Sequence, residues 1–386
     1  MFHSSYIEIS ESALKNNLDY LRNRFGGDVI FSSVIKGNAY GHGIENILPL
    51  AEKYGVNHFS VFSANEALKA LKYRTNGSEI MIMGMIDNEQ VEWAVENGIS
   101  FYVFEKDRLN SAIENAKRLK TKAKIHVELE TGMYRTGFEE SELDEINEII
   151  KKNTEFLSVE GICTHFAGAE SISNYLRVKN QMKLYSRMLR KIQKSGLIFK
   201  KCHVACSAAA IRYKRTLMDM VRIGIAQYGM WPNRETFMHD VSEQEGDEYA
   251  VDPLNRVISW KTNVMSLKEI PANRFVGYGT SYLTNTKTTI ATVPVGYVHG
   301  FNRNLSNLGK VMIHGKHVPV IGLVNMNMMV VDVTNLENVQ KGDEVVIIGN
   351  QDGNELSVSS FSELTNYLNY ETLARLPEVI PRFVVD

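Results

Sequence analysis

The sequence has few cysteines, little net charge and no long apolar run, and each of these shortages excludes a class of protein. The three cysteines, Cys163, Cys202 and Cys206, cannot all pair and lack both disulfide-framework and zinc-site spacing, so we expect reduced thiols in a reducing compartment. A formal net charge of −2 without a basic stripe gives no reason to expect nucleic-acid binding. No apolar stretch is long enough to cross a bilayer, and no metal site is expected.

The composition is that of a folded globular protein, with 44% hydrophobic and 23% charged residues. Residues 1–10 show no basic segment followed by an apolar run, so no secretory signal is expected and the protein is predicted to be cytoplasmic. A chain of 386 residues is too long for one ordinary compact core, which predicts one large domain and one smaller domain.

The first two-thirds of the chain alternates short apolar runs with amphipathic ones. Leu14, Leu18, Leu21 and Phe25 share one helical face, and the glycines that follow end that helix. Strands are expected over residues 29–35, 58–62, 79–83, 100–103, 124–129, 159–163, 201–205 and 222–228, and helices over 89–96, 142–151 and 175–193. Such an alternation predicts a TIM barrel, because the glycine-rich turn of a dinucleotide-binding open sheet is missing.

The pattern changes after Trp231 and Pro232. Residues 234–252 are polar and acidic, which predicts a linker or a surface excursion. Strands are then expected over 257–267, 288–295, 311–313, 318–324, 328–333 and 344–348, followed by an amphipathic helix near 361–368. The predicted domains are a barrel at 1–240 and a mainly β domain at 241–386, with the first ten or so residues assigned to the β domain as an alternative.

Lys36 ends the first expected barrel strand, in the run Lys36-Gly-Asn-Ala-Tyr40-Gly-His-Gly43. Barrel enzymes place catalytic groups at the C-terminal ends of strands. A lysine there can form an imine with an aldehyde cofactor, and desolvation helps it to act as a base. Its position alone, however, favours a surface lysine at a strand end.

The run from Lys36 to Gly43 resembles the cofactor-lysine signature of the alanine racemases, pyridoxal 5′-phosphate (PLP) enzymes of fold type III. Further blocks resemble that family in the same order, at 130–135, 164–167, 207–209, 222–229, 277–279, 293–297, 324–326 and 369–371. The resemblance extends from about Tyr6 to Arg382, and so many blocks in register make it specific. It implies a TIM barrel with a mainly β C-terminal domain, PLP as the cofactor and a small amino acid as the substrate.

The resemblance implies that Lys36 holds PLP as a Schiff base and that seven further residues bind the cofactor. These are Tyr40, His165, Ser207, Arg222, Gly224, Ile225 and Tyr370. A phosphate needs hydroxyl and backbone N–H donors, and the loops after strands seven and eight of a TIM barrel are the usual phosphate site. Without the family, Ser207 is equally a helix N-cap, Tyr370 a core aromatic and His165 a core histidine.

Arg222 bears most on the reaction type. The matching arginine of the family faces the pyridine nitrogen of PLP, where an always-protonated guanidinium can only donate a hydrogen bond. A donor there favours an unprotonated pyridine nitrogen, a weaker electron sink and fewer side reactions. The alternative for Arg222 is a salt bridge to a nearby acid.

Racemisation needs one base on each face of a planar carbanion, and the resemblance assigns these roles to Lys36 and to Tyr278 of the partner subunit. It thereby implies a head-to-tail homodimer with active sites at the subunit interface. An ordinary tyrosine has a pKa of about 10, so nearby positive charge or hydrogen-bond donors must lower the cost of ionising Tyr278. The resemblance implies that His165 and Arg135 are these neighbours. Tyr282 is a nearby alternative that the family spacing disfavours. Tyr297 and the backbone of Met326 match positions that shape the substrate pocket.

The sequence departs from the family at several positions. Glu128 stands where many members carry a carbamylated lysine, and as an anion it could orient Arg135 without CO₂. Asn325-Met326-Asn327, Tyr134 and Val298-His299 also differ from the usual residues. Because of these departures, serine or a somewhat larger amino acid is an alternative to alanine as the substrate.

The sequence thus predicts an alanine racemase that interconverts L- and D-alanine, with D-alanine for peptidoglycan as the implied product. A fold III decarboxylase is disfavoured because it needs a carboxylate where Arg222 stands. A non-catalytic PLP-binding protein is disfavoured by the β domain with Tyr278. An inactive structural homologue is disfavoured by the complete set of site residues.

Overall fold

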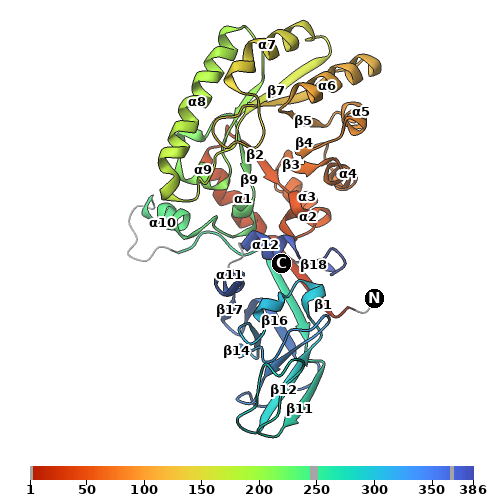
Figure 1. Ribbon diagram of the computed structural model, residues 1–386, viewed down its shortest axis with the longest axis vertical. Coiled ribbons are helices and arrows are strands. Elements are labelled where there is room, and N and C mark those ends of the chain that lie inside the picture. Colours follow the sequence, from red (N-terminus) through yellow and green to blue (C-terminus); the bar gives the residue numbers. More distant parts are fainter. Residues whose placement is uncertain (1–2, 244–250, 366–368) are drawn as a thin grey trace. The chain divides into compact units, whose positions relative to one another are not determined.

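The computed structural model describes residues 3–243, 251–365 and 369–386 (Figure 1). The chain forms two compact units. The barrel unit comprises Ala13–Lys36 and Ile47–Asn255, and the β unit comprises the residues up to Ser12, Gly37–Asn46 and Arg256–Asp386. No helix among the described residues has the length and apolar character that crossing a membrane requires.

The barrel unit contains an eight-stranded parallel sheet with the order β8-β7-β6-β5-β4-β3-β2-β9. Its strands are β2 (Ile30–Val34), β3 (His58–Ser63), β4 (Glu79–Met85), β5 (Ser100–Val103), β6 (Ala123–Glu128), β7 (Leu157–Cys163), β8 (Lys201–His203) and β9 (Met220–Ile223). An isolated bridge between Cys206 and Arg222 links the chain beyond β8 to β9, so the barrel is nearly closed. The predicted TIM barrel is confirmed.

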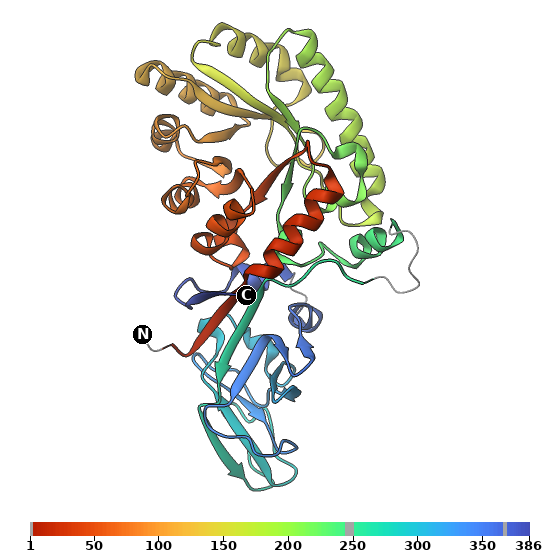
Figure 2. The same cartoon turned by 180° about the vertical axis from the view of Figure 1, so that it is seen from behind.

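Helices follow most of the strands and lie around the outside of the sheet (Figures 1 and 2). They are α1 (Glu11–Phe25), α3 (Ile44–Lys53), α4 (Ala64–Tyr73), α5 (Asn88–Glu96), α6 (Lys106–Leu119), α7 (Leu143–Lys152), α8 (Tyr175–Lys194), α9 (Ser207–Arg212) and α10 (Arg234–Glu243). In α7, for example, Leu143, Ile146 and Ile150 are buried on one face, as the helical periodicity predicts.

Two predictions in this half of the chain are wrong. The strand expected over 222–228 ends at Ile223, because Gly224 leaves the extended conformation and a 3₁₀ turn, Ile225–Tyr228, follows. That turn is fixed by the Tyr228 hydroxyl, which donates to the Val34 carbonyl at 2.9 Å. The linker or surface excursion expected over 234–252 begins with the helix α10, which buries the polar side chains of Thr236 and Asp240. Residues 244–250 of that linker lie outside the described residues.

The β unit contains one sheet with the order β14-β13-β16-β10-β1-β18, with β17 added to β16, and a three-stranded sheet β11-β12-β15. The strands are β1 (Ser5–Ser10), β10 (Ile258–Asn263), β11 (Ser266–Ile270), β12 (Thr288–Val293), β13 (Lys310–Ile313), β14 (Lys316–Pro319), β15 (Met329–Asp332), β16 (Glu344–Gln351), β17 (Asn354–Leu356) and β18 (Arg382–Val385). Two short helices, α11 (Ser359–Thr365) and α12 (Asn369–Ala374), complete the unit. A mainly β second unit was predicted and is confirmed.

Several boundaries in this unit were predicted wrongly. The single strand expected over 257–267 is two strands, because the chain passes at Val264 and Met265 from the sheet of β16 to the sheet of β12. The strand expected over 318–324 ends at Pro319. The helix expected near 361–368 is present as far as the described residues go, as part of α11, and residues 366–368 lie outside the described part of the chain. The strands β1, β17 and β18 were not predicted.

The segment labelled α2 (Lys36–Tyr40) is a left-handed turn rather than a helix. Gly37, Asn38, Ala39 and Tyr40 have φ between 52° and 62°, and Gly41 continues the turn with φ 82°. A left-handed conformation costs a non-glycine residue roughly 1–2 kcal/mol, so surrounding interactions must hold the turn in place. Within the β unit, the Gly41 carbonyl accepts a hydrogen bond from Arg382 Nε at 2.8 Å, and a Cβ at Gly41 would collide with the Leu373 carbonyl oxygen.

We expect Gly41→Ala to lower the thermal unfolding midpoint by more than about 6 °C, because backbone strain and a backbone collision add together. Gly77 provides a matched control, since its φ is 77° but a Cβ there would meet no atom within 4 Å. Gly77→Ala should lower the midpoint by only about 2–4 °C, the effect of roughly 1 kcal/mol of strain. Scanning calorimetry measures both shifts, and equal shifts would contradict the collision.

Candidate active site

Lys36 lies just beyond β2, at the C-terminal end of the parallel strands, where the Ile35 amide donates to the Ser60 carbonyl at 2.9 Å. Its side chain reaches solvent but is densely surrounded by protein atoms. This desolvation and the positive charges of Arg135 and Arg222 lower the Lys36 pKa, while Glu66 partly opposes them. The amine is therefore more often neutral near physiological pH than that of an ordinary lysine.

Arg222, on β9, is buried, with 4% of its surface exposed. Its Nη1 donates to the His203 carbonyl at 2.8 Å and also contacts His203 Nδ1. Its Nη2 donates to the carbonyls of Thr164 (2.8 Å) and Val204 (3.2 Å). These acceptors follow or end β7 and β8 and carry no formal charge. Among the described residues Arg222 has no carboxylate within ion-pair distance, so the guanidinium charge is not neutralised by an acid.

Two buried histidines extend this network, and the sequence analysis did not identify them. His126 Nδ1 lies 2.8 Å from His203 Nε2, and burial lowers the pKa of both rings well below the usual value. Because His203 Nδ1 faces a donor on Arg222, we assign the proton to His203 Nε2, which then donates to His126. Gly161 on β7 leaves room for both rings, since a Cβ there would crowd them. Strand alternation could have identified His126 from the sequence, because residues 126 and 128 of one strand point to the same face as each other.

His165 is the second residue after the end of β7 and lies among positive charges. Burial, Arg222, Arg135 and Lys36 together lower its pKa to about 3. The ring is therefore neutral at physiological pH. An ionising tyrosine can be stabilised by a hydrogen-bond donor or by a positive charge. A neutral His165 could act only as the donor, whereas Arg135 carries a positive charge.

Glu128 ends β6 and is buried, with 4% exposure. Burial raises its pKa, and the opposing influences are a hydrogen bond from the Thr136 hydroxyl (2.8 Å) and the positive charge of Arg135. Glu128 and Arg135, both described residues, form no direct ion pair. Thr136 is next to Arg135 in the chain, so the hydroxyl that donates to Glu128 belongs to the loop that carries Arg135.

Glu130, another residue that the sequence analysis did not identify, shapes the loop that carries Arg135. Its two carboxylate oxygens accept hydrogen bonds from the amides of Met133 and Tyr134, each at 2.8 Å. Tyr134 adopts φ 58° and is 86% exposed. A glycine at this position would adopt that φ without strain, whereas Tyr134 depends on the Glu130 contacts.

A donor-rich surface lies where the chain leaves β8 and β9. Ser207 is the first residue of α9, and its hydroxyl accepts a hydrogen bond from the Gly224 amide at 3.0 Å. Ile225 begins the following 3₁₀ turn, so its N–H lies in the first turn, where no intrahelical acceptor is available. A hydroxyl, the Ile225 N–H and a glycine that allows close approach suit the phosphate of PLP, with the Lys36 amine and Arg222 donors in the same unit.

The other predicted site residues belong to the β unit. The rings of Tyr40 and Tyr370 meet edge to face, with centroids 6.3 Å apart. The Tyr297 amide donates to the Asn325 carbonyl at 3.0 Å, and the next amide donates to the Met326 carbonyl at 3.0 Å. The structure therefore brings Tyr40 to Tyr370, and Tyr297 to Met326, within this unit.

Tyr278 is 73% exposed on a turn in which Gly277 and Gly279 have φ of 71° and 74°. Tyr282, its alternative in the sequence, instead packs against the buried cluster of Val276 and its neighbours. The exposed Tyr278 is the one of these two tyrosines whose side chain is available to a ligand or a second subunit.

The described part of the chain holds no group of three or more metal-ligating side chains. Its three cysteines are unpaired.

The family models for the alanine racemase N-terminal and C-terminal domains match residues 9–232 and 257–384. The chain is 33% identical to the alanine racemase of Leptospira interrogans, covering 100% of this chain and 96% of that one. It is 32% identical to the alanine racemase of Methanococcus maripaludis, covering 98% of each.

Solved structures agree with these matches. The alanine racemase of Clostridium difficile 630 superposes with a TM-score of 0.90 at 29% identity, covering 100% of this chain and 96% of that one. The alanine racemase of Bartonella henselae, solved with covalently bound pyridoxal phosphate, superposes with a TM-score of 0.85 at 25% identity and full coverage of both chains. From its sequence and its fold, the chain belongs to the alanine racemase family and is an amino-acid racemase, an isomerase.

Proposed function

We propose that the protein interconverts L- and D-alanine with PLP as its cofactor, and that Lys36 and Tyr278 of the partner subunit act as the two bases. The observation that carries this proposal is Arg222, a buried cation whose partners are neutral acceptors. PLP, when bound, supplies the electron sink that weakens the substrate Cα–H bond. The protein supplies the positions of the donors and the bases.

Lys36 would hold the cofactor and, once released from it, exchange a proton with the substrate Cα through its Nζ. The lowered pKa suits this role, because a base must be neutral before it can accept a proton. Ser207, Gly224 and Ile225 would bind the phosphate, together with the hydroxyls of Tyr40 and Tyr370.

Arg222 would donate to the pyridine nitrogen. A carboxylate in its place would keep that nitrogen protonated and strengthen the electron sink, which is the requirement of the rival decarboxylase chemistry. With the neutral ring of His203 behind it, Arg222 remains a donor at every working pH. This arrangement favours rapid return of a proton to Cα and therefore racemisation.

Arg135, with Glu128 behind it, would supply positive charge beside the substrate carboxylate and Tyr278 of the partner subunit, while neutral His165 would donate a hydrogen bond. Tyr297 and Met326 would shape the substrate pocket. Because the second base comes from another copy of the chain, the proposal requires a homodimer.

Incubation of the holoenzyme with single L-amino acids in D₂O tests the reaction and its substrate together. We expect L-alanine to exchange its Cα proton for deuterium and to invert, as followed by NMR and chiral chromatography. Lys36→Ala should abolish both exchange and inversion, whereas Lys194→Gln, at an exposed position on α8, should leave both unchanged. Failure to invert any small amino acid would refute the racemase, and faster inversion of serine would replace alanine as the substrate.

The pH dependence of cofactor attachment tests the electrostatics around Lys36. In the apoenzyme, the rate of imine formation with PLP should rise with a midpoint below the ordinary lysine pKa of about 10.4, because the neutral amine is the reacting form. Arg135→Gln should raise this midpoint, because it removes a positive charge that disfavours the protonated lysine. Glu66→Gln should lower the midpoint further, because it removes a negative charge that favours the protonated lysine. The distant Lys194→Gln should do neither, and a shift of both site variants in one direction would contradict the assignment.

Glu128 should make the enzyme independent of CO₂. Removal or addition of bicarbonate is expected to leave kcat/KM unchanged in the parent, while Glu128→Lys should respond to bicarbonate. Glu128→Gln should lower kcat/KM about tenfold, or ~1.4 kcal/mol, because Arg135 loses its anion. Burial raises the pKa of Glu128, so the parent should lose this contribution as the pH falls towards and through that raised pKa. Dependence of the parent on CO₂ would contradict the role.

A further inference from the structure

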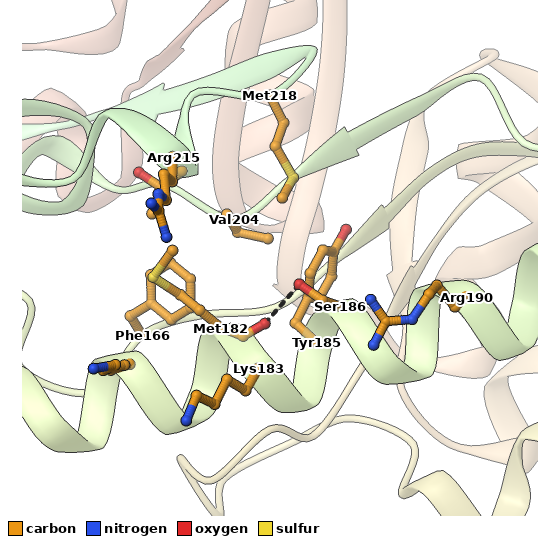
Figure 3. A pocket seen from close by; sticks show the side chains of 11 residues that line it. Phe166, Met182, Lys183, Tyr185, Ser186, Arg190, Val204, Arg215 and Met218 are labelled. Carbon is orange, nitrogen blue, oxygen red and sulfur yellow. Dashed lines mark hydrogen bonds between the residues drawn. The ribbon is translucent and has the colours of Figure 1, made fainter.

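A cavity of about 380 Å³ opens on the barrel unit between α8 and the segment Arg215–Met218 (Figure 3). Its apolar lining includes Phe166 and Val204, which are 3% and 1% exposed, together with Met182 and Met218. The volume falls within the range of roughly 300–1,000 Å³ found for small-molecule sites. Lys36, Ser207, Arg222 and Gly224 do not line it, and the residue that it shares with the site described above is Val204, whose carbonyl accepts from Arg222.

The charged side chains around this cavity are all cations. Lys179, Lys183 and Arg190 lie on α8 at intervals of four and seven residues, which places them along one face of the helix. Arg215 approaches from the opposite side, as Figure 3 shows. No acidic residue lines the cavity, and none of the four cations has an ion-pair partner in the part of the chain that the structure describes.

The hydroxyl groups of the lining are already engaged. Tyr185 donates to the Ile162 carbonyl at 2.9 Å, Ser186 to the Met182 carbonyl at 2.8 Å and Thr216 to the Ala209 carbonyl at 3.0 Å. The free donors are therefore the ammonium and guanidinium groups. A ligand that suits this lining must carry negative charge at one end and apolar surface at the other.

We propose that this cavity binds a small organic phosphate monoester with an apolar, ring-sized body. A phosphate monoester carries close to two negative charges at neutral pH, which matches a group of four cations better than a single carboxylate does. The apolar body would replace water against Phe166, Val204 and the two methionines. This site does not depend on the proposed reaction, since none of its residues takes part in it.

Calorimetric titration of the PLP-saturated holoenzyme with phenyl phosphate tests the proposal. Phenyl phosphate has no aldehyde and cannot form an imine with a lysine. It should bind the parent, and the double variant Arg190→Gln/Arg215→Gln should bind it at least about tenfold more weakly, because two charge-assisted contacts are lost. Lys194→Gln removes one cation from the same helix outside the cavity and should bind it as the parent does. Circular dichroism of each variant checks that the fold is retained.

Three further titrations separate the cavity from simple charge attraction. Inorganic phosphate should bind at least about tenfold more weakly than phenyl phosphate, because it buries no apolar surface. Benzyl alcohol should not bind measurably, and Ser186→Phe, which places a ring in the cavity, should weaken phenyl phosphate binding. Absence of binding to the parent, equal binding by the double variant, or equal affinity for inorganic phosphate would each overturn the proposal.

Discussion

The buried charge of Arg222 is the constraint on which the site depends. A guanidinium cannot give up its proton, so its burial is tolerated only when acceptors surround it. Three backbone carbonyls, from Thr164, His203 and Val204, supply most of them. These carbonyls lie where β7 and β8 end, so the requirement of one side chain fixes how two strands leave the barrel. The contact with Arg222 also fixes the tautomer of His203, which places the proton on Nε2, and His126 therefore accepts a hydrogen bond from it.

The same constraint explains the electrostatic character of the region. Lys36, Arg135 and Arg222 place three cationic side chains around His165, which responds by remaining neutral. Glu128 is the buried acid that offsets them, and its raised pKa reflects the cost of burying it. A site with this excess of positive charge is complementary to ligands that carry phosphate and carboxylate groups. Positive surroundings also ease loss of the lysine proton, which connects binding with proton transfer.

The sequence predicted the elements whose signal is local. Alternating strands and amphipathic helices predicted the barrel, and the runs around Lys36 and Arg222 pointed to the candidate site. It did not reveal the contact between His126 and His203, because 77 residues separate two rings that only the pairing of β6 and β8 with β7 brings together. It also missed β1 and β18, whose pairing joins the two ends of the chain. The misplaced strand at 222–228 has another origin, since an apolar run does not distinguish a buried strand from a buried turn.

The turn after Lys36 could not have been predicted from propensity, because Asn38, Ala39 and Tyr40 all adopt a conformation that side chains disfavour. Its stability comes from hydrogen bonds that only the folded chain provides, among them Gly43 N–H to the Asn38 carbonyl at 2.9 Å and Arg382 to the Gly41 carbonyl. The strain has a positional consequence. A right-handed helix starting at Lys36 would direct residues 37–40 along a different path, whereas the left-handed turn brings Tyr40 to Tyr370 within four residues of the lysine. The disfavoured backbone is thus the means by which Tyr40 meets Tyr370 within the β unit.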